Sequence, residues 1–122
     1  YIGRTPVIIT RDKSGDIHGL INACAHRGAR VCREKSGNRK TFTCPFHGWT
    51  YGAAGNLLDV TDEEKGGYSP KFSRDDYGLP KIAKLESYRG FIFGSLSDDV
   101  QPLSDYLAGA KTFIDLMVDQ SQ

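Results

Sequence analysis

Apolar and polar side chains alternate along the first two thirds of the chain, a pattern that predicts β-strands. Branched and aromatic residues recur with a period of two, and clusters of Gly, Asn, Asp and Ser separate the runs as turns do. The predicted strands, in chain order, are PVIIT, HGLINAC, KTFTC, WTYG and LLDV. Neighbouring runs are joined by short turns, so we expect antiparallel hairpins and an all-β fold class.

The pattern changes after this region. Residues 61–80 are rich in charge, Gly and Pro and predict a loop, whereas KIAKLESYRGFIFGSL predicts two more strands broken near Arg89 and Gly90. From Pro102, apolar residues recur at three- and four-residue steps, which predicts an amphipathic helix. We therefore expect β structure followed by one C-terminal α-helix.

Length and composition narrow the range of partners. The chain has 122 residues, with 16 Lys and Arg against 15 Asp and Glu, so its net charge of +1 gives no reason to expect nucleic acid as a partner. No apolar run reaches the roughly 20 residues of a membrane helix, so we expect no membrane association. The chain begins without Met, which indicates a piece of a longer protein. Its 3 Cys cannot all pair in disulfides, which favours a reducing, cytoplasmic location.

Two short segments carry the candidate chemistry. CAHRG contains Cys24 and His26, and CPFHGW contains Cys44 and His47, giving the spacing C-x-H-x17-C-x2-H. Each segment offers one thiolate and one imidazole beside a glycine that permits a tight bend. The 17 residues between His26 and Cys44 are enough to form a strand or two and bring the second segment back beside the first. We therefore predict one metal centre built from two loops.

Two kinds of centre use this donor set. A structural zinc ion takes two Cys and two His in a tetrahedron, but zinc loops usually pair Cys with Cys and His with His. A [2Fe–2S] cluster with two Cys on one iron and two His on the other uses mixed pairs naturally. The spacing favours the iron–sulfur cluster and leaves zinc as the alternative.

The same segments carry a family resemblance. CxHRG followed by CPxHGW resembles the Rieske domain of aromatic-ring-hydroxylating dioxygenase large (α) subunits, and the flanking INACAHRGARVC, FTCPFHGWTY and ESYRGFIFGSL extend it over the whole chain. The similarity is greatest to the benzoate, toluate and anthranilate branch. It implies a Rieske-type antiparallel β-sandwich at residues 1–101, with cluster-binding loops at about 22–52. Residues 102–122 would form the helix that leads toward a catalytic domain missing from this chain.

The resemblance also implies the ligands and the function. Cys24 and Cys44 would hold one iron of the cluster, and His26 and His47 the other. The domain would pass NADH-derived electrons to a mononuclear Fe(II) in the missing domain, which dihydroxylates a benzoate-like aromatic substrate, so the chain holds no catalytic residue itself. Its expected partners are a reductase, in some systems a ferredoxin, neighbouring α subunits and a small β subunit. The alternative is a stand-alone Rieske ferredoxin that only carries electrons.

Residues beside the predicted ligands suggest a low reduction potential. Rieske proteins of quinol-oxidising complexes carry a disulfide between the two loops, but Ala29 and Phe46 stand at those positions here. The same proteins place a Ser, which donates a hydrogen bond to the cluster, where this chain has Trp49. The indole N–H is a different donor on a different side chain. Tyr51 matches a family position whose hydroxyl can reach a cysteine sulfur, although a half-buried strand Tyr explains it equally well.

Other polar residues receive simpler interpretations. Cys32 lies at no ligand spacing and is expected to be a small buried apolar residue. His18 is expected to be an ordinary strand residue. Arg27 adjoins a ligand and is expected to pack or hydrogen-bond behind it. The basic segment 27–40 is expected to be mainly solvated surface, with docking of an acidic electron donor as the alternative.

Overall fold

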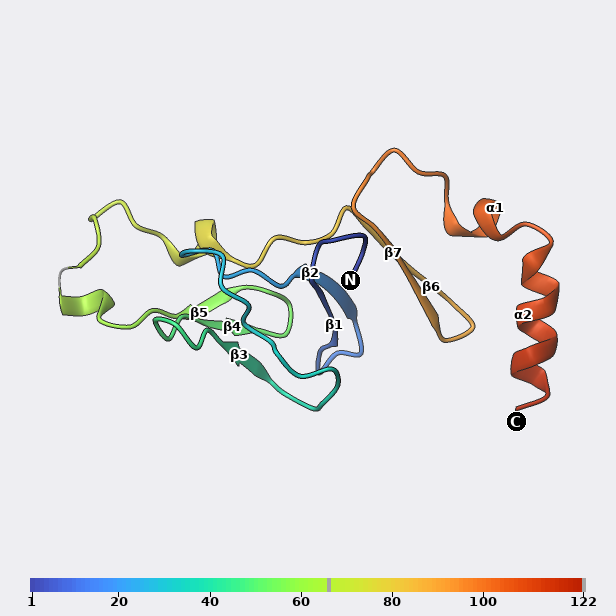
Figure 1. The fold of residues 1–122 in the computed structure, drawn as a ribbon, viewed down its shortest axis with the longest axis horizontal. Coiled ribbons are helices and arrows are strands. Elements are labelled where there is room, and N and C mark those ends of the chain that lie inside the picture. Colours follow the sequence, from blue (N-terminus) through green and yellow to red (C-terminus); the bar gives the residue numbers. More distant parts are fainter. Residues whose placement is uncertain (66, 122) are drawn as a thin grey trace. The chain divides into compact units, whose positions relative to one another are not determined.

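The computed structural model describes residues 1–65 and 67–121, which form strands paired only in antiparallel fashion, followed by helix (Figure 1). The chain divides into two compact units, Tyr1–Lys81 and Ile82–Gln122, each of which we describe by itself. The predicted all-β class with a C-terminal helical segment is confirmed.

The first unit contains two sheets. Strands β1 (Val7–Arg11) and β2 (Ile17–Ile21) form a hairpin, and β3 (Thr41–Thr43), β4 (Thr50–Gly52) and β5 (Leu57–Asp59) form a meander in that order. All five strands fall within the predicted runs or extend them by one residue. The Thr10 hydroxyl of β1 donates a 2.6 Å hydrogen bond to the carbonyl of Ala53, which ties the hairpin to the β4–β5 turn.

The hydrophobic core of this unit gathers one or more buried side chains from every one of these strands. Its members are Ile8, Leu20, Cys24, Val31, Phe42, Cys44, Trp49, Tyr51, Leu57, Val60 and Leu79. Burying each large apolar side chain contributes about 1.5–3 kcal/mol of transfer free energy. The two cysteines predicted as ligands are therefore part of the core, and packing fixes their positions.

The segment predicted as a loop between residues 61 and 80 is more ordered than expected. It contains two 3₁₀ turns, η1 (Glu63–Lys65) and η2 (Arg74–Tyr77). The Arg74 guanidinium binds the Glu63 carboxylate, with its Nε 2.7 Å from Oε2, and also donates to the Leu58 carbonyl of β5. These contacts fasten the segment to the meander.

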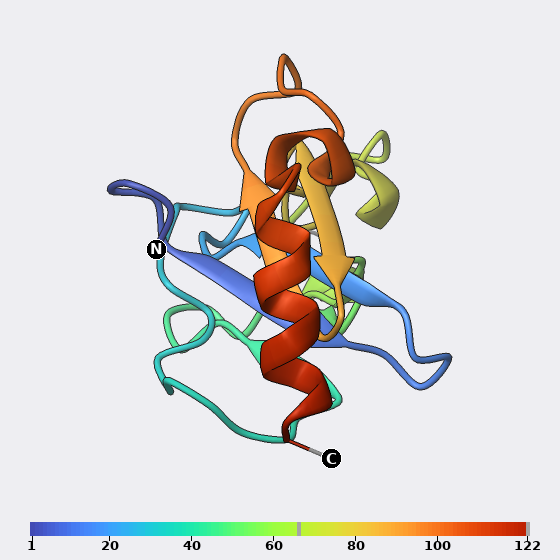
Figure 2. The same ribbon diagram turned by 90° about the vertical axis from the view of Figure 1, so that its right-hand side faces the viewer.

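The second unit consists of a hairpin and two short helices. Strands β6 (Lys84–Tyr88) and β7 (Phe91–Ser95) turn at Arg89 and Gly90, which both have positive φ. The predicted single helix is interrupted: α1 (Leu103–Leu107) and α2 (Ala110–Asp119) are separate coils in Figure 2. Ala108 adopts a φ of 41° between them, which an α-helix does not allow. The helices are held to the hairpin by polar contacts, among them a 3.0 Å bond from the Tyr88 hydroxyl to Asp115.

Within the described part of the chain, no helix combines the length and apolar character that crossing a membrane requires.

Candidate metal centre

The first of the two predicted loops follows β2 and is closed by its own backbone. The Gly28 N–H donates to the Cys24 carbonyl at 2.7 Å, and the Cys24 N–H donates to the Ala29 carbonyl at 2.8 Å. Gly28 has a φ of 75°, a left-handed conformation that side chains other than Gly rarely adopt. The glycine thus turns the chain back on itself after the histidine.

The second loop joins β3 to β4 and repeats this closure residue for residue from its cysteine. The Gly48 N–H donates to the Cys44 carbonyl at 3.0 Å, and the Cys44 N–H donates to the Trp49 carbonyl at 2.7 Å. Gly48 has a φ of 78°, and a Cβ at this position would lie 2.5 Å from the Thr61 hydroxyl oxygen. The two loops are therefore equivalent in backbone geometry, although their histidines lie two and three residues after the cysteine.

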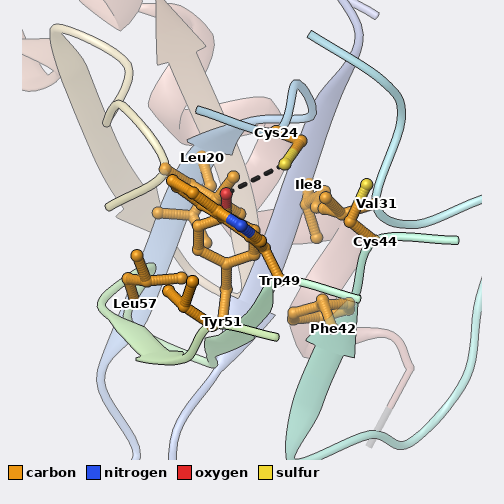
Figure 3. Packing of buried hydrophobic residues seen from close by; sticks show 11 residues of the cluster. Ile8, Leu20, Cys24, Val31, Phe42, Cys44, Trp49, Tyr51 and Leu57 are labelled. Atoms are coloured by element: carbon orange, nitrogen blue, oxygen red, sulfur yellow. Dashed lines mark hydrogen bonds between the residues drawn. The ribbon is translucent and has the colours of Figure 1, made fainter. Parts of the chain in front are cut away.

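Both thiols point into the core, and a tyrosine hydroxyl reaches one of them (Figure 3). Cys24 and Cys44 are 4% and 3% exposed, and the Tyr51 hydroxyl lies 3.1 Å from the Cys24 sulfur. That hydroxyl oxygen accepts a 3.0 Å hydrogen bond from the Ala25 N–H, so its own proton is free to point at the sulfur. Burial, together with the bond to Cys24, raises the pKa of Tyr51, which keeps the phenol protonated as a donor. Of the two interpretations of Tyr51, the structure supports contact with the sulfur.

The two imidazoles lie together on the outside of the loops. The side chains of His26 and His47 are exposed, and their ring centroids are 4.7 Å apart in an edge-to-face arrangement. Among the described residues, no three His, Cys, Asp or Glu side chains are grouped closely enough to hold a single ion. The donors are instead arranged as a buried sulfur set and an exposed nitrogen set. This separation fits the donor chemistry of a cluster with two sulfur and two nitrogen ligands.

An aromatic group supports the nitrogen side. The indole of Trp49 stacks on the His26 ring at 5.0 Å with an interplanar angle of 14°. Its Nε1–H donates to the Tyr68 hydroxyl at 3.2 Å, so the indole donor has a different direction from the serine hydroxyl of quinol-oxidising Rieske proteins, as expected. Tyr68 belongs to the segment 61–80, for which the sequence predicts a loop. The irregular spacing of its aromatic residues gave no periodic signal.

A comparison with protein families identifies this arrangement. The model of the Rieske [2Fe-2S] domain matches residues 1–88, which include both loops and both sheets of the first unit. The chain belongs to the Rieske [2Fe-2S] domain family. The predicted cofactor class and the predicted Rieske-type fold are confirmed.

Known relatives extend the match beyond this Rieske domain. The chain is 50% identical to the toluate 1,2-dioxygenase α subunit of Pseudomonas putida over 98% of its own length and 27% of that subunit. The large subunit of 2-halobenzoate 1,2-dioxygenase from Burkholderia cepacia gives 50% identity over 98% and 26%. The crystal structure of naphthalene 1,2-dioxygenase from Rhodococcus sp. superposes with a TM-score of 0.89 and 42% identity, covering 96% of this chain and 26% of that one. The chain thus spans about a quarter of the length of these relatives, and the expected resemblance to dioxygenase large subunits is confirmed.

Asn22 has a structural role in the Rieske domain that the sequence does not indicate. Asn22 is 7% exposed, and its side-chain oxygen accepts 3.0 Å hydrogen bonds from the N–H groups of Val31 and Cys32. Its amide nitrogen donates to the Cys32 carbonyl at 2.6 Å. Asn22 therefore fixes the chain that leaves the first loop. An asparagine beside a predicted strand gives no signal of this role, because its partners lie nine and ten residues away.

The remaining polar residues are placed as follows. Cys32 packs against the core but is only half-buried, whereas the sequence predicts a buried residue. His18 is more than an ordinary strand residue, because its Nε2 lies 2.7 Å from the Asp12 carboxylate. Arg27 is exposed, and within the described residues it makes no side-chain hydrogen bond, so the expected packing or hydrogen bonding behind the ligand is not seen.

The basic segment 27–40 is largely exposed, as expected for solvated surface. Its single acidic residue, Glu34, forms a 2.5 Å ion pair with Arg39. The part of the segment from Cys32 to Arg39 also borders a cavity of about 300 Å³ beside β1. The cavity wall contains three cationic side chains, Arg11, Lys35 and Arg39.

Proposed function

We propose that this chain is the electron-transfer Rieske domain of the large subunit of an aromatic-ring-hydroxylating dioxygenase. The observation that carries the proposal is the pair of backbone-equivalent loops, which bury Cys24 and Cys44 and set His26 against His47 at the surface. The similarity to dioxygenase large subunits over 98% of the chain supports the choice of enzyme class.

In this proposal Cys24 and Cys44 hold one iron and His26 and His47 the other. When bound, the [2Fe–2S] cluster supplies a one-electron redox couple. The chain's own residues determine the surroundings of the cluster. The core excludes water from the sulfur side, and the Tyr51 hydroxyl donates to the Cys24 sulfur. The exposed imidazoles mark the side of the centre that solvent and partners can reach.

The remainder of the enzyme completes the proposed function. We infer that residues 1–101 form the Rieske domain and that 102–122 lead toward a catalytic domain with a mononuclear Fe(II), where the aromatic ring is dihydroxylated. A benzoate-like acid is the favoured substrate, because the toluate and 2-halobenzoate relatives are 50% identical and the naphthalene enzyme 42%. Electrons would come from NADH through a reductase, directly or by way of a ferredoxin. Neighbouring α subunits and a small β subunit are the proposed assembly partners.

A cytoplasmic location is part of the same proposal. None of the three cysteines forms a disulfide in the described part of the chain, which supports a reducing compartment.

The experiment that tests the ligand set is metal and sulfide analysis of protein purified without oxygen. We expect about two irons and two acid-labile sulfides per chain, the stoichiometry of a [2Fe–2S] cluster. Cys24→Ser and Cys44→Ser should abolish both, whereas the matched control Cys32→Ser should retain them because Cys32 lies outside the two loops. Protein that binds zinc and contains no sulfide would refute the proposal in favour of a structural zinc module.

A second experiment separates an oxygenase subunit from a stand-alone ferredoxin. The reading frame beyond residue 122 should continue into a domain containing two His and one carboxylate able to bind iron. A stop codon soon after residue 122 would favour the ferredoxin.

A further inference from the structure

The His26 imidazole lies in an aromatic setting that the proposed ligand role does not require. One face of its ring is covered by the indole of Trp49, which is only 3% exposed although His26 itself is exposed. Among the described residues, the His26 side chain has ring contacts and no hydrogen bond. An exposed imidazole can rotate about its terminal side-chain torsion, which has broad minima. Stacking on a buried indole therefore restricts the orientation of this ring.

Trp49 is in turn held by a segment distant in sequence. Its Nε1–H donates to the Tyr68 hydroxyl at 3.2 Å. The rings of Phe72 and Tyr77 approach the indole edge-on, at 5.9 Å and 6.0 Å. A buried indole N–H is costly to leave without an acceptor, so the bond to Tyr68 selects one orientation of the indole plane.

The segment that carries these rings is held by contacts of its own. Tyr68 packs on Phe72 at 4.8 Å, and Phe72 stacks on Tyr77 at 5.0 Å with an interplanar angle of 19°. Arg74, within the same segment, binds Glu63 and the Leu58 carbonyl of β5. We call Tyr68, Phe72 and Tyr77 the aromatic clasp. It connects the meander to the ring that covers His26.

We propose that Tyr68 is a positioning residue that fixes the orientation of the His26 imidazole through Trp49. The proposal rests on the assignment of His26 as a cluster ligand in the proposed function. The clasp acts on one imidazole only, because His47 contacts His26 and Phe46 but has no ring contact with Trp49 within the described residues. Loss of the Tyr68 hydroxyl should therefore disturb one nitrogen ligand and leave the other unchanged.

The test uses Tyr68→Phe, which removes the acceptor and keeps the ring. The matched control is Tyr77→Phe, since the Tyr77 ring touches the same indole without a hydrogen bond to it. In iron-loaded, reduced protein, pulsed EPR resolves the nitrogen couplings of the two imidazoles. We expect Tyr68→Phe to shift or broaden one coupling and leave the second as in the wild type, while Tyr77→Phe changes neither. Ultraviolet resonance Raman should show the hydrogen bond of the indole N–H weakened only in Tyr68→Phe.

A double-mutant cycle distinguishes positioning from general loosening. Trp49→Phe removes the indole donor, so adding Tyr68→Phe to it should cause no further change in the shifted coupling. Additive changes, equal changes in both imidazoles, or unchanged couplings in Tyr68→Phe would overturn the proposal.

Failure of the proposed function is separable from failure of the clasp. If wild-type protein takes up no iron, the function is refuted, and the clasp is then tested by proton NMR of the metal-free chain. The Trp49 ring current should shift the His26 ring protons upfield, and the shift should decrease in Tyr68→Phe but not in Tyr77→Phe. An undiminished shift in Tyr68→Phe would refute the clasp.

Discussion

Removal of the Tyr51 hydroxyl should lower the reduction potential of the cluster. In Tyr51→Phe, the Cys24 sulfur loses a donor that lies 3.1 Å away, and the phenyl ring still fills the core site. Reduction adds negative charge to the cluster and its sulfur ligands, so a donor aimed at the sulfur stabilises the reduced state more than the oxidised state. Without that donor the reduced state is less favoured.

The size of the effect follows from the strength of such bonds. A hydrogen bond to a charged group contributes about 1.5–3 kcal/mol, and we take about half of it to depend on the redox state. For one electron, a tenfold change in equilibrium, about 1.4 kcal/mol, corresponds to about 59 mV. The potential of Tyr51→Phe should therefore fall by about 30–60 mV. Ala25 also loses its acceptor, but that residue is exposed and water can replace the hydroxyl.

Protein-film voltammetry of the iron-loaded chain measures this difference. The matched control is Tyr106→Phe, whose hydroxyl belongs to an exposed side chain of α1. A shift in Tyr51→Phe no larger than that of the control, or a rise in potential, would show that the Tyr51 proton is not directed at the sulfur. Iron content measured on the same samples excludes partial loss of the cluster as the cause.

Three further predictions concern the loops, the β1–β2 turn and the potential itself. In urea titrations, Gly48→Ala should lower the free energy of unfolding more than Gly28→Ala. An alanine in the left-handed conformation costs about 1–2 kcal/mol at either position, but only at Gly48 must the Thr61 side chain also move. The hydrogen bond from His18 lowers the pKa of Asp12, so the ionised Asp12 stabilises the fold above its unfolded pKa of about 3.9, and this stabilisation is lost as the pH falls through the lower folded pKa. Over this pH range the free energy of unfolding should fall more steeply in the wild type than in Asp12→Asn. Parallel plots of unfolding free energy against pH would contradict this. The wild-type potential should lie nearer about −150 mV than +300 mV, the ends of the Rieske range, because the second loop directs its indole donor to a tyrosine and not to the cluster; a clearly positive value would contradict this.

The elements that the sequence predicts well are those with a local cause. The hairpin strands follow from a two-residue period between turn residues, and the pairing of Ile8 with Leu20 places two core side chains opposite each other. The bends that carry the four candidate ligands are likewise local, because each pair lies beside a glycine of positive φ. Short-range geometry is encoded in short-range sequence, so these features can be predicted without a structure.

The features that the sequence does not predict depend on contacts between distant residues. Tyr68 meets Trp49 across 19 positions, and Asn22 binds backbone groups nine and ten positions away, with no periodicity to indicate either contact. The break between α1 and α2 is hidden for another reason. The apolar residues on either side, Leu107 and Ala110, keep a helical spacing, so the period continues through a point where the backbone does not.

The distribution of burial at the centre indicates how the domain separates stability from access. Both thiols are core residues, so changing either one removes a proposed ligand and also a packed side chain. The imidazoles lie outside the core, and substitution of His47 should alter the centre with little loss of packing. Phe46, which packs against the His47 ring, is 62% exposed, so this side of the centre is open to solvent. The chain thus encloses the sulfur side within its own fold and leaves the nitrogen side exposed.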